Sequence, residues 1–168
     1  MVRLWSPDIR VEKELSRSAL GAVAGDIAII LSGEPLDITI ISLGCQIAKA
    51  AKRKIHLLYV IEVPRVLPLK AVLAQESERA DTLLNSALAL AGRRGCEAIA
   101  EVVQAREAGP AIVDETHDRR CALLFIGLIR SKNDLGKIVP YVLTNAHCRV
   151  WLVQEPPKPS RKEKRQES

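Results

Sequence analysis

The stretch from Cys121 to Val153 limits most strictly what this chain can fold into. It opens with the apolar run Ala122–Ile126, closed by Gly127. A run that short, and apolar at every position, is typical of a strand buried on both faces of a parallel sheet. After a polar loop, Gly136 leads into a predicted helix, and Cys148–Val153 forms a second strand. A strand, a glycine-containing loop, a helix and a strand form a unit that binds phosphate in many doubly wound folds.

The rest of the chain repeats this alternation of short apolar strands and amphipathic helices. The other predicted elements, in chain order, are the strand Ile27–Leu31, the helix Glu34–Ala51, the strand Ile55–Ile61, a helix from about Leu69 to Gly92, the strand Cys96–Gln104 and the helix Ala111–Arg119. Connections of this length allow crossover helices to join parallel strands. The pattern predicts an α/β fold, a doubly wound five-stranded parallel sheet with helices on both faces.

The 168 residues fit one domain, at 25–155, with an extension at each end. In residues 1–24 apolar side chains recur at helical spacing, so this segment is interpreted as a helix that packs on the domain or on a partner chain. Residues 156–168 combine three prolines and many charges with no large apolar residue. We expect this tail to be disordered.

The net charge of +5 lies mostly in that tail. From position 156 onward five basic and two acidic residues contribute +3, which leaves +2 for everything before them. With only 3% aromatic residues, the chain lacks the basic face with stacking aromatics that nucleic-acid binding needs. No apolar run approaches the roughly 20 residues of a membrane span, and the N-terminus has no signal-peptide pattern. We expect a soluble, cytoplasmic protein that neither binds nucleic acid nor inserts directly into a membrane.

The four cysteines show no C-x-x-C spacing, which predicts reduced, buried thiols. Cys121 and Cys148 are predicted to begin adjacent strands at the amino edge of the sheet. His56, His117 and His147 are assigned to the same edge, whereas ligands of open α/β folds bind at the carboxyl edge. Since standard ligand spacing is missing, no metal site is predicted.

No candidate nucleophile can be paired with a plausible base, and the chain contains no Gly-x-Ser-x-Gly elbow. Glu62 and Asp134 are expected to reach the carboxyl edge and are interpreted as solvated loop carboxylates. We therefore predict that the chain is not an enzyme.

Four segments carry a resemblance to a known family. Leu57–Glu62 is similar to the strand Leu-Leu-His-Val-Ile-Asp of universal stress proteins, and Gly109–Ile112 is similar to the start of their third helix. Cys121–Gly127 occupies the place of their Asp-Leu-Ile-Val-Met-Gly strand, and Ala146–Val153 that of their closing Ala-x-Cys-Pro-Val-x-Val-Val. The chain from about Asp26 to Gln154 thus resembles a universal stress protein domain, which implies a Rossmann-like sheet with strand order 3-2-1-4-5.

The resemblance also implies a nucleotide site at the end of the fourth strand, in altered form. Nucleotide-binding members carry Gly-x2-Gly-x9-Gly-Ser/Thr, in which glycines let backbone amides approach phosphate oxygens. Gly127 fits the first glycine, but Arg130 stands in the place of the second. Gly136 fits the third if the loop is four residues shorter, and Lys137 replaces the hydroxyl residue. The two cations add positive charge at the expected phosphate position.

Three further residues belong to this expected site. Ser32 stands where binding members usually have an aspartate that contacts the nucleoside, and Val60 fits a valine of the adenine pocket. Leu31 is expected to offer backbone contacts. The ligand would be an adenine nucleotide, with ATP or AMP as candidates, or another anion. An alternative from a different class stays open, namely a dimerising interaction module without nucleotide binding, associated with a membrane transporter.

The fifth predicted strand would lie at an edge of a sheet with this order. Natural proteins blunt such edges with charge or proline, but this strand has Arg149 as its only charge. The resemblance implies that two copies pair through this strand, which makes the chain a homodimer. The residues of the expected interface are Cys148, Val150, Trp151, Leu152 and Val153. Coverage of the edge by the N-terminal helix, or by the segment with Trp5, is the alternative.

Overall fold

The computed structural model describes residues 24–128 and 136–156. Its elements are β1 (Asp26–Ile30), α2 (Leu36–Ala51), β2 (Ile55–Glu62), α3 (Ala74–Arg93), β3 (Ala98–Ala105), α4 (Ala108–Asp118), β4 (Cys121–Leu128), α5 (Ile138–Asn145) and β5 (Arg149–Gln154). All neighbouring strands are parallel, and their order is β3-β2-β1-β4-β5. The predicted five-stranded, doubly wound sheet and its order are confirmed.

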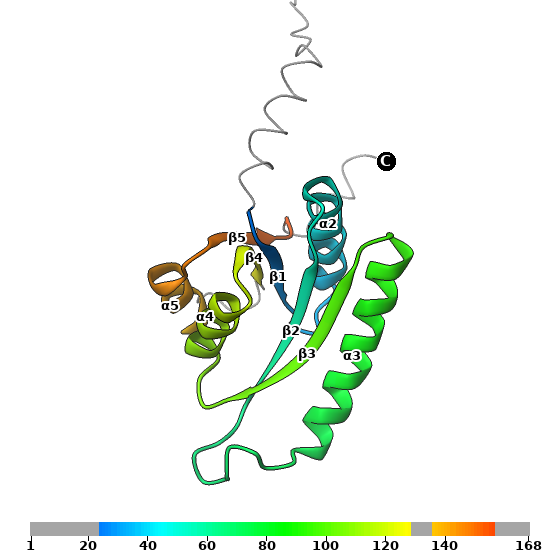
Figure 1. The fold of residues 1–168 in the computed structure, drawn as a ribbon. Coiled ribbons are helices and arrows are strands. Elements are labelled where there is room, and N and C mark those ends of the chain that lie inside the picture. The colour runs from blue at the N-terminus through cyan, green and yellow to red at the C-terminus, as the bar shows by residue number, and fades with distance from the viewer. Residues whose placement is uncertain (1–23, 129–135, 157–168) are drawn as a thin grey trace, which may run out of the picture.

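Helices cover both faces of the sheet. Figure 1 shows α2 and α3 on one side and α4 and α5 on the other. Under α2 and α3 the core includes Ile29, Leu57 and Phe125. On the other face, Leu58 and Leu124 belong to the core under α4 and α5. Because successive strand residues point to opposite faces, central strands covered on both faces are apolar at nearly every position. This is why the apolar runs predicted these strands.

The carboxyl ends of three strands meet at one edge of the sheet. Ile30 at the end of β1 pairs with Leu58 of β2 on one side and with Ile126 of β4 on the other. The crossover from β1 to β2 runs through α2 on one face, and the crossover from β3 to β4 runs through α4 on the opposite face. The place between β1 and β4 is therefore a topological switch point, where open α/β sheets bind ligands.

Helix α3 begins later than predicted, at Ala74 instead of about Leu69. The preceding residues form two consecutive turns, in which the N–H of Leu67 donates to the carbonyl of Pro64 and the N–H of Ala71 donates to that of Pro68. The prediction was wrong here because a contact distant in sequence holds the loop in place. We call residues 64–72 the turn loop.

The guanidinium of Arg106, the residue directly after β3, holds the turn loop in place. It donates to three backbone carbonyls, at 3.1 Å to Val63, 2.6 Å to Pro64 and 2.8 Å to Leu67. Hydrogen bonds from a charged donor are the stronger class in proteins. The loop consequently keeps a defined shape although Val66 is 90% exposed.

Other boundaries also differ from the prediction. Helix α4 begins at Ala108 rather than Ala111, since Pro110 is its third residue and proline is tolerated in a first helical turn. Strand β3 begins at Ala98 rather than Cys96, because the N–H of Cys96 still donates to the carbonyl of Ala91 at the end of α3.

Several expectations concern residues outside the described part of the chain. These are the helical extension up to residue 23 with Trp5, the segment with Arg130 and Asp134, and the tail from residue 157 onward. Within residues 24–128 and 136–156, no helix is both long enough and apolar enough to cross a membrane.

Candidate functional site

Leu31 directly follows β1 at the switch point. Since Ile30 pairs with Ile126, Leu31 lies level with Gly127 at the end of β4. The Leu31 side chain is buried, with 3% of its surface exposed, and its N–H donates to the carbonyl of Leu58 at 2.9 Å. Because its amide and side chain are already engaged, Leu31 can offer a ligand only its carbonyl oxygen.

Ser32 is tied to an acidic residue that the sequence analysis did not identify, Asp37 in the first turn of α2. The Asp37 carboxylate accepts hydrogen bonds from the N–H of Ser32 at 3.0 Å, from its hydroxyl at 2.9 Å and from the N–H of Gly33 at 2.8 Å. An acid in the first turn of a helix after a strand was the available signal. The chain's own carboxylate thus occupies two backbone donors beside the switch point.

Burial raises the pKa of Asp37, although the hydrogen bonds from Gly33 and Ser32 oppose that shift. Because the folded-state pKa lies above the unfolded one, the contribution of this group to stability is fully present below the unfolded pKa of 3.8 and is lost as pH rises through the folded pKa.

Urea unfolding of the parent and of Asp37→Asn between pH 3 and about 6 should show the parent losing stability relative to the variant as pH increases. The exposed substitution Asp114→Asn sets the baseline. A parent-minus-variant difference that grows with pH would contradict the sign.

Glu62 ends β2 at the same edge of the sheet. Its carboxylate accepts a hydrogen bond of 2.7 Å from the N–H of Ala108, the first residue of α4. The interpretation of Glu62 as a purely solvated carboxylate was therefore wrong, because the free amides at a helix start attract an anion. Next to it, a Cβ added to Gly109 would lie 3.1 Å from the ring of Tyr141, so this glycine lets α4 and α5 pack closely.

Gly127 in β4 and Val60 in β2 are the other predicted site residues toward the carboxyl edge of the sheet. A Cβ added to Gly127 would lie 3.0 Å from Ile40 and 3.1 Å from Leu36, both on α2. Gly127 therefore allows β4 to pack against α2, a role that is independent of any ligand. Val60 is half-buried and packs on the core under α4 and α5.

Gly136 and Lys137 stand at the start of α5. Gly136 has a positive φ of 62°, a conformation that glycine adopts at low cost. Lys137 is the residue before the helix, and its side chain is exposed. The sequence-predicted residues thus fall into two groups, one at the ends of β1, β2 and β4 and one before α5, while Arg130 lies outside the described residues.

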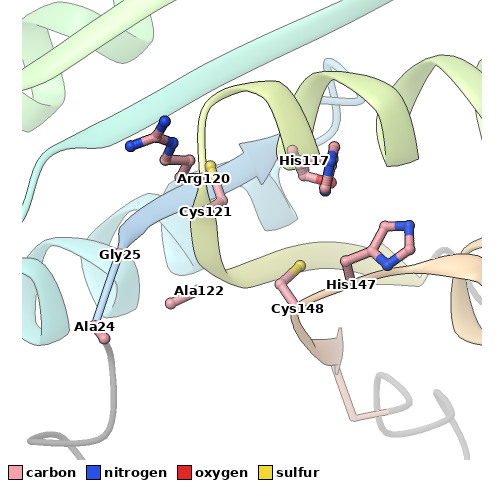
Figure 2. A pocket seen from close by; sticks show the side chains of 9 residues that line it. Ala24, Gly25, His117, Arg120, Cys121, Ala122, His147 and Cys148 are labelled. Carbon is pink, nitrogen blue, oxygen red and sulfur yellow. The ribbon is translucent and has the colours of Figure 1, made fainter.

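The opposite, amino edge of the sheet carries a hollow of about 440 Å³ (Figure 2). His117, His147, Cys121 and Cys148 line it, and the two imidazole rings lie 4.9 Å apart between centroids. Burial raises the pKa of Cys121 to about 12 and also raises that of Cys148, so both thiols stay protonated at neutral pH. In the described ranges no three His, Cys, Asp or Glu side chains are grouped to hold a metal ion.

His56 is the second residue of β2, inside the predicted strand and near the amino edge to which it was assigned. Its Nε2 is 3.1 Å from a carboxylate oxygen of Asp26, at the start of β1. The ring is 8% exposed, and its pairing with Asp26 links the beginnings of two neighbouring strands. This contact serves the sheet rather than the switch point.

Solved structures share this fold. A universal stress protein from Archaeoglobus fulgidus matches with a TM-score of 0.65 and 12% identity, covering 77% of this chain and 98% of its own. The structure of the universal stress protein from Archaeoglobus fulgidus in complex with dAMP matches with a TM-score of 0.63 and 14% identity, at the same coverage. A universal stress protein family protein from Arabidopsis thaliana with AMP bound matches with a TM-score of 0.58 and 14% identity, covering 82% of this chain and 98% of its own.

The sequence itself carries the family pattern over most of its length. No curated protein matches the chain. A sequence model of the "Universal stress protein family", however, matches residues 37–154, which run from the first turn of α2 to the end of β5. The chain belongs to the universal stress protein family.

Proposed function

We propose that this chain is a non-enzymatic, cytoplasmic regulatory module that binds an adenine nucleotide at the carboxyl edge of its sheet, between β1 and β4. The observation that carries the proposal is the switch point there, where Leu31 lies beside Gly127. Proteins of the same fold have been solved in complex with dAMP and with AMP, which supports this ligand class. The nucleoside would lie near Ser32 and Val60, and the phosphates would lie toward Gly127, Arg130, Gly136 and Lys137.

In this site the phosphates would depend on side-chain cations more than on backbone amides. The amides of Ser32 and Gly33 already donate to Asp37, and that of Ala108 donates to Glu62. Two carboxylates near the site also disfavour an anion unless positive charge compensates for them. Arg130 and Lys137 supply that charge, at the positions where the family motif has a glycine and a hydroxyl residue.

The double variant Arg130→Ala/Lys137→Ala should bind nucleotide much more weakly than the parent. Losing a charge-assisted phosphate contact costs about 1.5–3 kcal/mol, which corresponds to roughly a tenfold to hundredfold rise in Kd per contact. Isothermal titration with ATP, AMP and cyclic AMP measures the change.

The matched control is Arg53→Ala/Arg93→Ala, which removes the same charge from exposed arginines at the ends of α2 and α3, toward the amino edge. This control should keep the parent Kd. If the Arg130/Lys137 variant binds as tightly as the parent, the residue assignment is wrong. If the parent binds none of the three nucleotides, the proposed function itself fails, and the alternative interaction module, associated with a transporter, takes its place.

A second property, homodimer formation through β5, is supported by a separate observation. Strand β5 is an edge strand that pairs only with β4 within the described chain, and two of its apolar side chains are exposed, Trp151 by 42% and Leu152 by 36%. Pairing with a second copy would satisfy the free backbone groups of the edge and bury these side chains.

A further inference from the structure

The loop between β1 and α2 lies against an arginine of α3. Gly33 follows Ser32 in this loop, and a Cβ added to Gly33 would lie 3.3 Å from Nη2 and 3.9 Å from Nε of Arg79. Arg79 belongs to the second turn of α3, which begins at Ala74. The guanidinium is thus held at the carboxyl edge of the sheet, beside the residue that follows Ser32.

Gly33 allows this close approach of helix and loop. Its φ is positive, at 80°, a conformation that glycine adopts at low cost. Leu83, one turn after Arg79 on α3, lies 3.9 Å from the same Cβ position. The packing of α3 along the loop therefore sets where the Arg79 side chain lies.

The Arg79 guanidinium is not used by the fold. Within residues 24–128 and 136–156 it forms no hydrogen bond or ion pair, and its side chain is exposed. Two other arginines toward the carboxyl edge are engaged, since Arg65 pairs with Glu107 and Arg106 donates to three carbonyls. All five N–H donors of Arg79 are therefore available to a ligand. Their planar arrangement suits a phosphate group in particular.

The charge around Ser32 also favours an anion. Ser32 stands where nucleotide-binding members of the family usually have an aspartate, whose carboxylate would repel a phosphate. The carboxylate of Asp37 is bound by three donors of Ser32 and Gly33 and so is directed into the loop. In dinucleotide-binding folds the same exchange separates two ligand classes: an acid binds the ribose hydroxyls, whereas a nearby arginine accommodates a phosphate on the ribose.

We propose that Arg79 binds a phosphate group on the ribose, so that the chain prefers adenine nucleotides with a second phosphate at the 2′ or 3′ carbon. This inference rests on the proposed function, because it requires the nucleoside to lie near Ser32. The 5′-phosphate is bound by Arg130 and Lys137, and the ribose phosphate is bound by Arg79. Each phosphate of such a ligand meets its own positive charge.

Isothermal titration of the full chain with 5′-AMP, adenosine 2′,5′-bisphosphate and adenosine 3′,5′-bisphosphate tests this inference. The buffer has an ionic strength of about 0.15 M, which screens charges farther apart than about 8 Å. We expect at least one bisphosphate to bind with a Kd roughly tenfold to hundredfold below that of 5′-AMP, the effect of one charge-assisted contact.

Arg79→Gln should remove this preference, because it raises the Kd of the bisphosphate much more than that of 5′-AMP. The matched control is Arg93→Gln, which removes the same charge from the last residue of the same helix, toward the amino edge. This control should keep the preference of the parent. Both arginines are exposed, and a melting curve verifies that each variant is folded.

The outcomes separate this inference from the proposed function. A parent that binds 5′-AMP but neither bisphosphate more tightly would overturn the inference and leave the proposed function standing. The inference is also wrong if Arg79→Gln keeps the preference, or if it raises the Kd of all three ligands by the same factor. A parent that binds none of the three ligands would remove the proposed function, and this inference with it.

Discussion

Replacing Phe125 by alanine should lower the free energy of unfolding by about 3–5 kcal/mol. Phe125 has no exposed surface and heads the fully buried side chains of the described core by volume. It lies in β4, between β1 and β5, and its ring packs in the core under α2 and α3. The packed surroundings collapse only in part around the space that a lost ring leaves, which adds a cavity penalty to the lost burial.

Urea unfolding followed by circular dichroism measures this loss. The matched control is Val66→Ala, since Val66 is 90% exposed on the turn loop and should change stability by no more than about 0.5 kcal/mol. Similar losses of stability in Phe125→Ala and Val66→Ala would mean that Phe125 does not hold the core together.

The Phe125 ring also contacts the Trp151 ring edge-on, with centroids 5.3 Å apart and an interplanar angle of 77°.

The double variant Trp151→Asp/Leu152→Asp should convert a dimer into a monomer. Each chain would place two carboxylates on the edge that meets its two-fold mate, so like charges would face each other across the interface. Val150 is less suitable for this test, because it is half-buried and packs on the core under α4 and α5. Light scattering measures the molar mass, and a melting curve verifies that the variant is folded.

The opposite edge of the sheet offers a matched control. Ile99 and Val102 on β3 are 40% and 38% exposed, similar to the two β5 side chains. Ile99→Asp/Val102→Asp adds the same charge to the other edge strand and should leave the dimer intact. A dimer that dissociates only in this control would place the interface on β3, and a parent that is monomeric would remove the dimer proposal altogether.

The strands were predictable because their signal is local. In Ile27–Leu31 and Ala122–Ile126, burial on both faces leaves a run of apolar residues that no surface segment would keep. The strand order came from the resemblance to a family, since periodicity does not say which strands are neighbours. The start of α3 could not be predicted from the local sequence, because the shape of the turn loop depends on Arg106, which follows α3 and β3 in the chain.

That Gly127 and Ser32 lie at one edge of the sheet was predictable, but the hydrogen bonding around them was not. Gly127 and Ser32 follow apolar runs, so the topology alone brings them to one edge. The partners of the nearby amides, Asp37 and Glu62, could not be assigned from the sequence, since an acid near a strand end is as often solvated as bonded. Whether the backbone amides near a family motif are free to bind a ligand depends on hydrogen bonds to such carboxylates, and not only on the residues of the motif.

The way in which Arg106 holds the turn loop resembles a small cation site in which the ion is a side chain. Three carbonyl oxygens converge on one positive charge, as they would around a bound metal ion. Unlike a bound ion, the guanidinium is part of the chain and cannot dissociate from it. The shape of this loop therefore does not depend on the supply of ions.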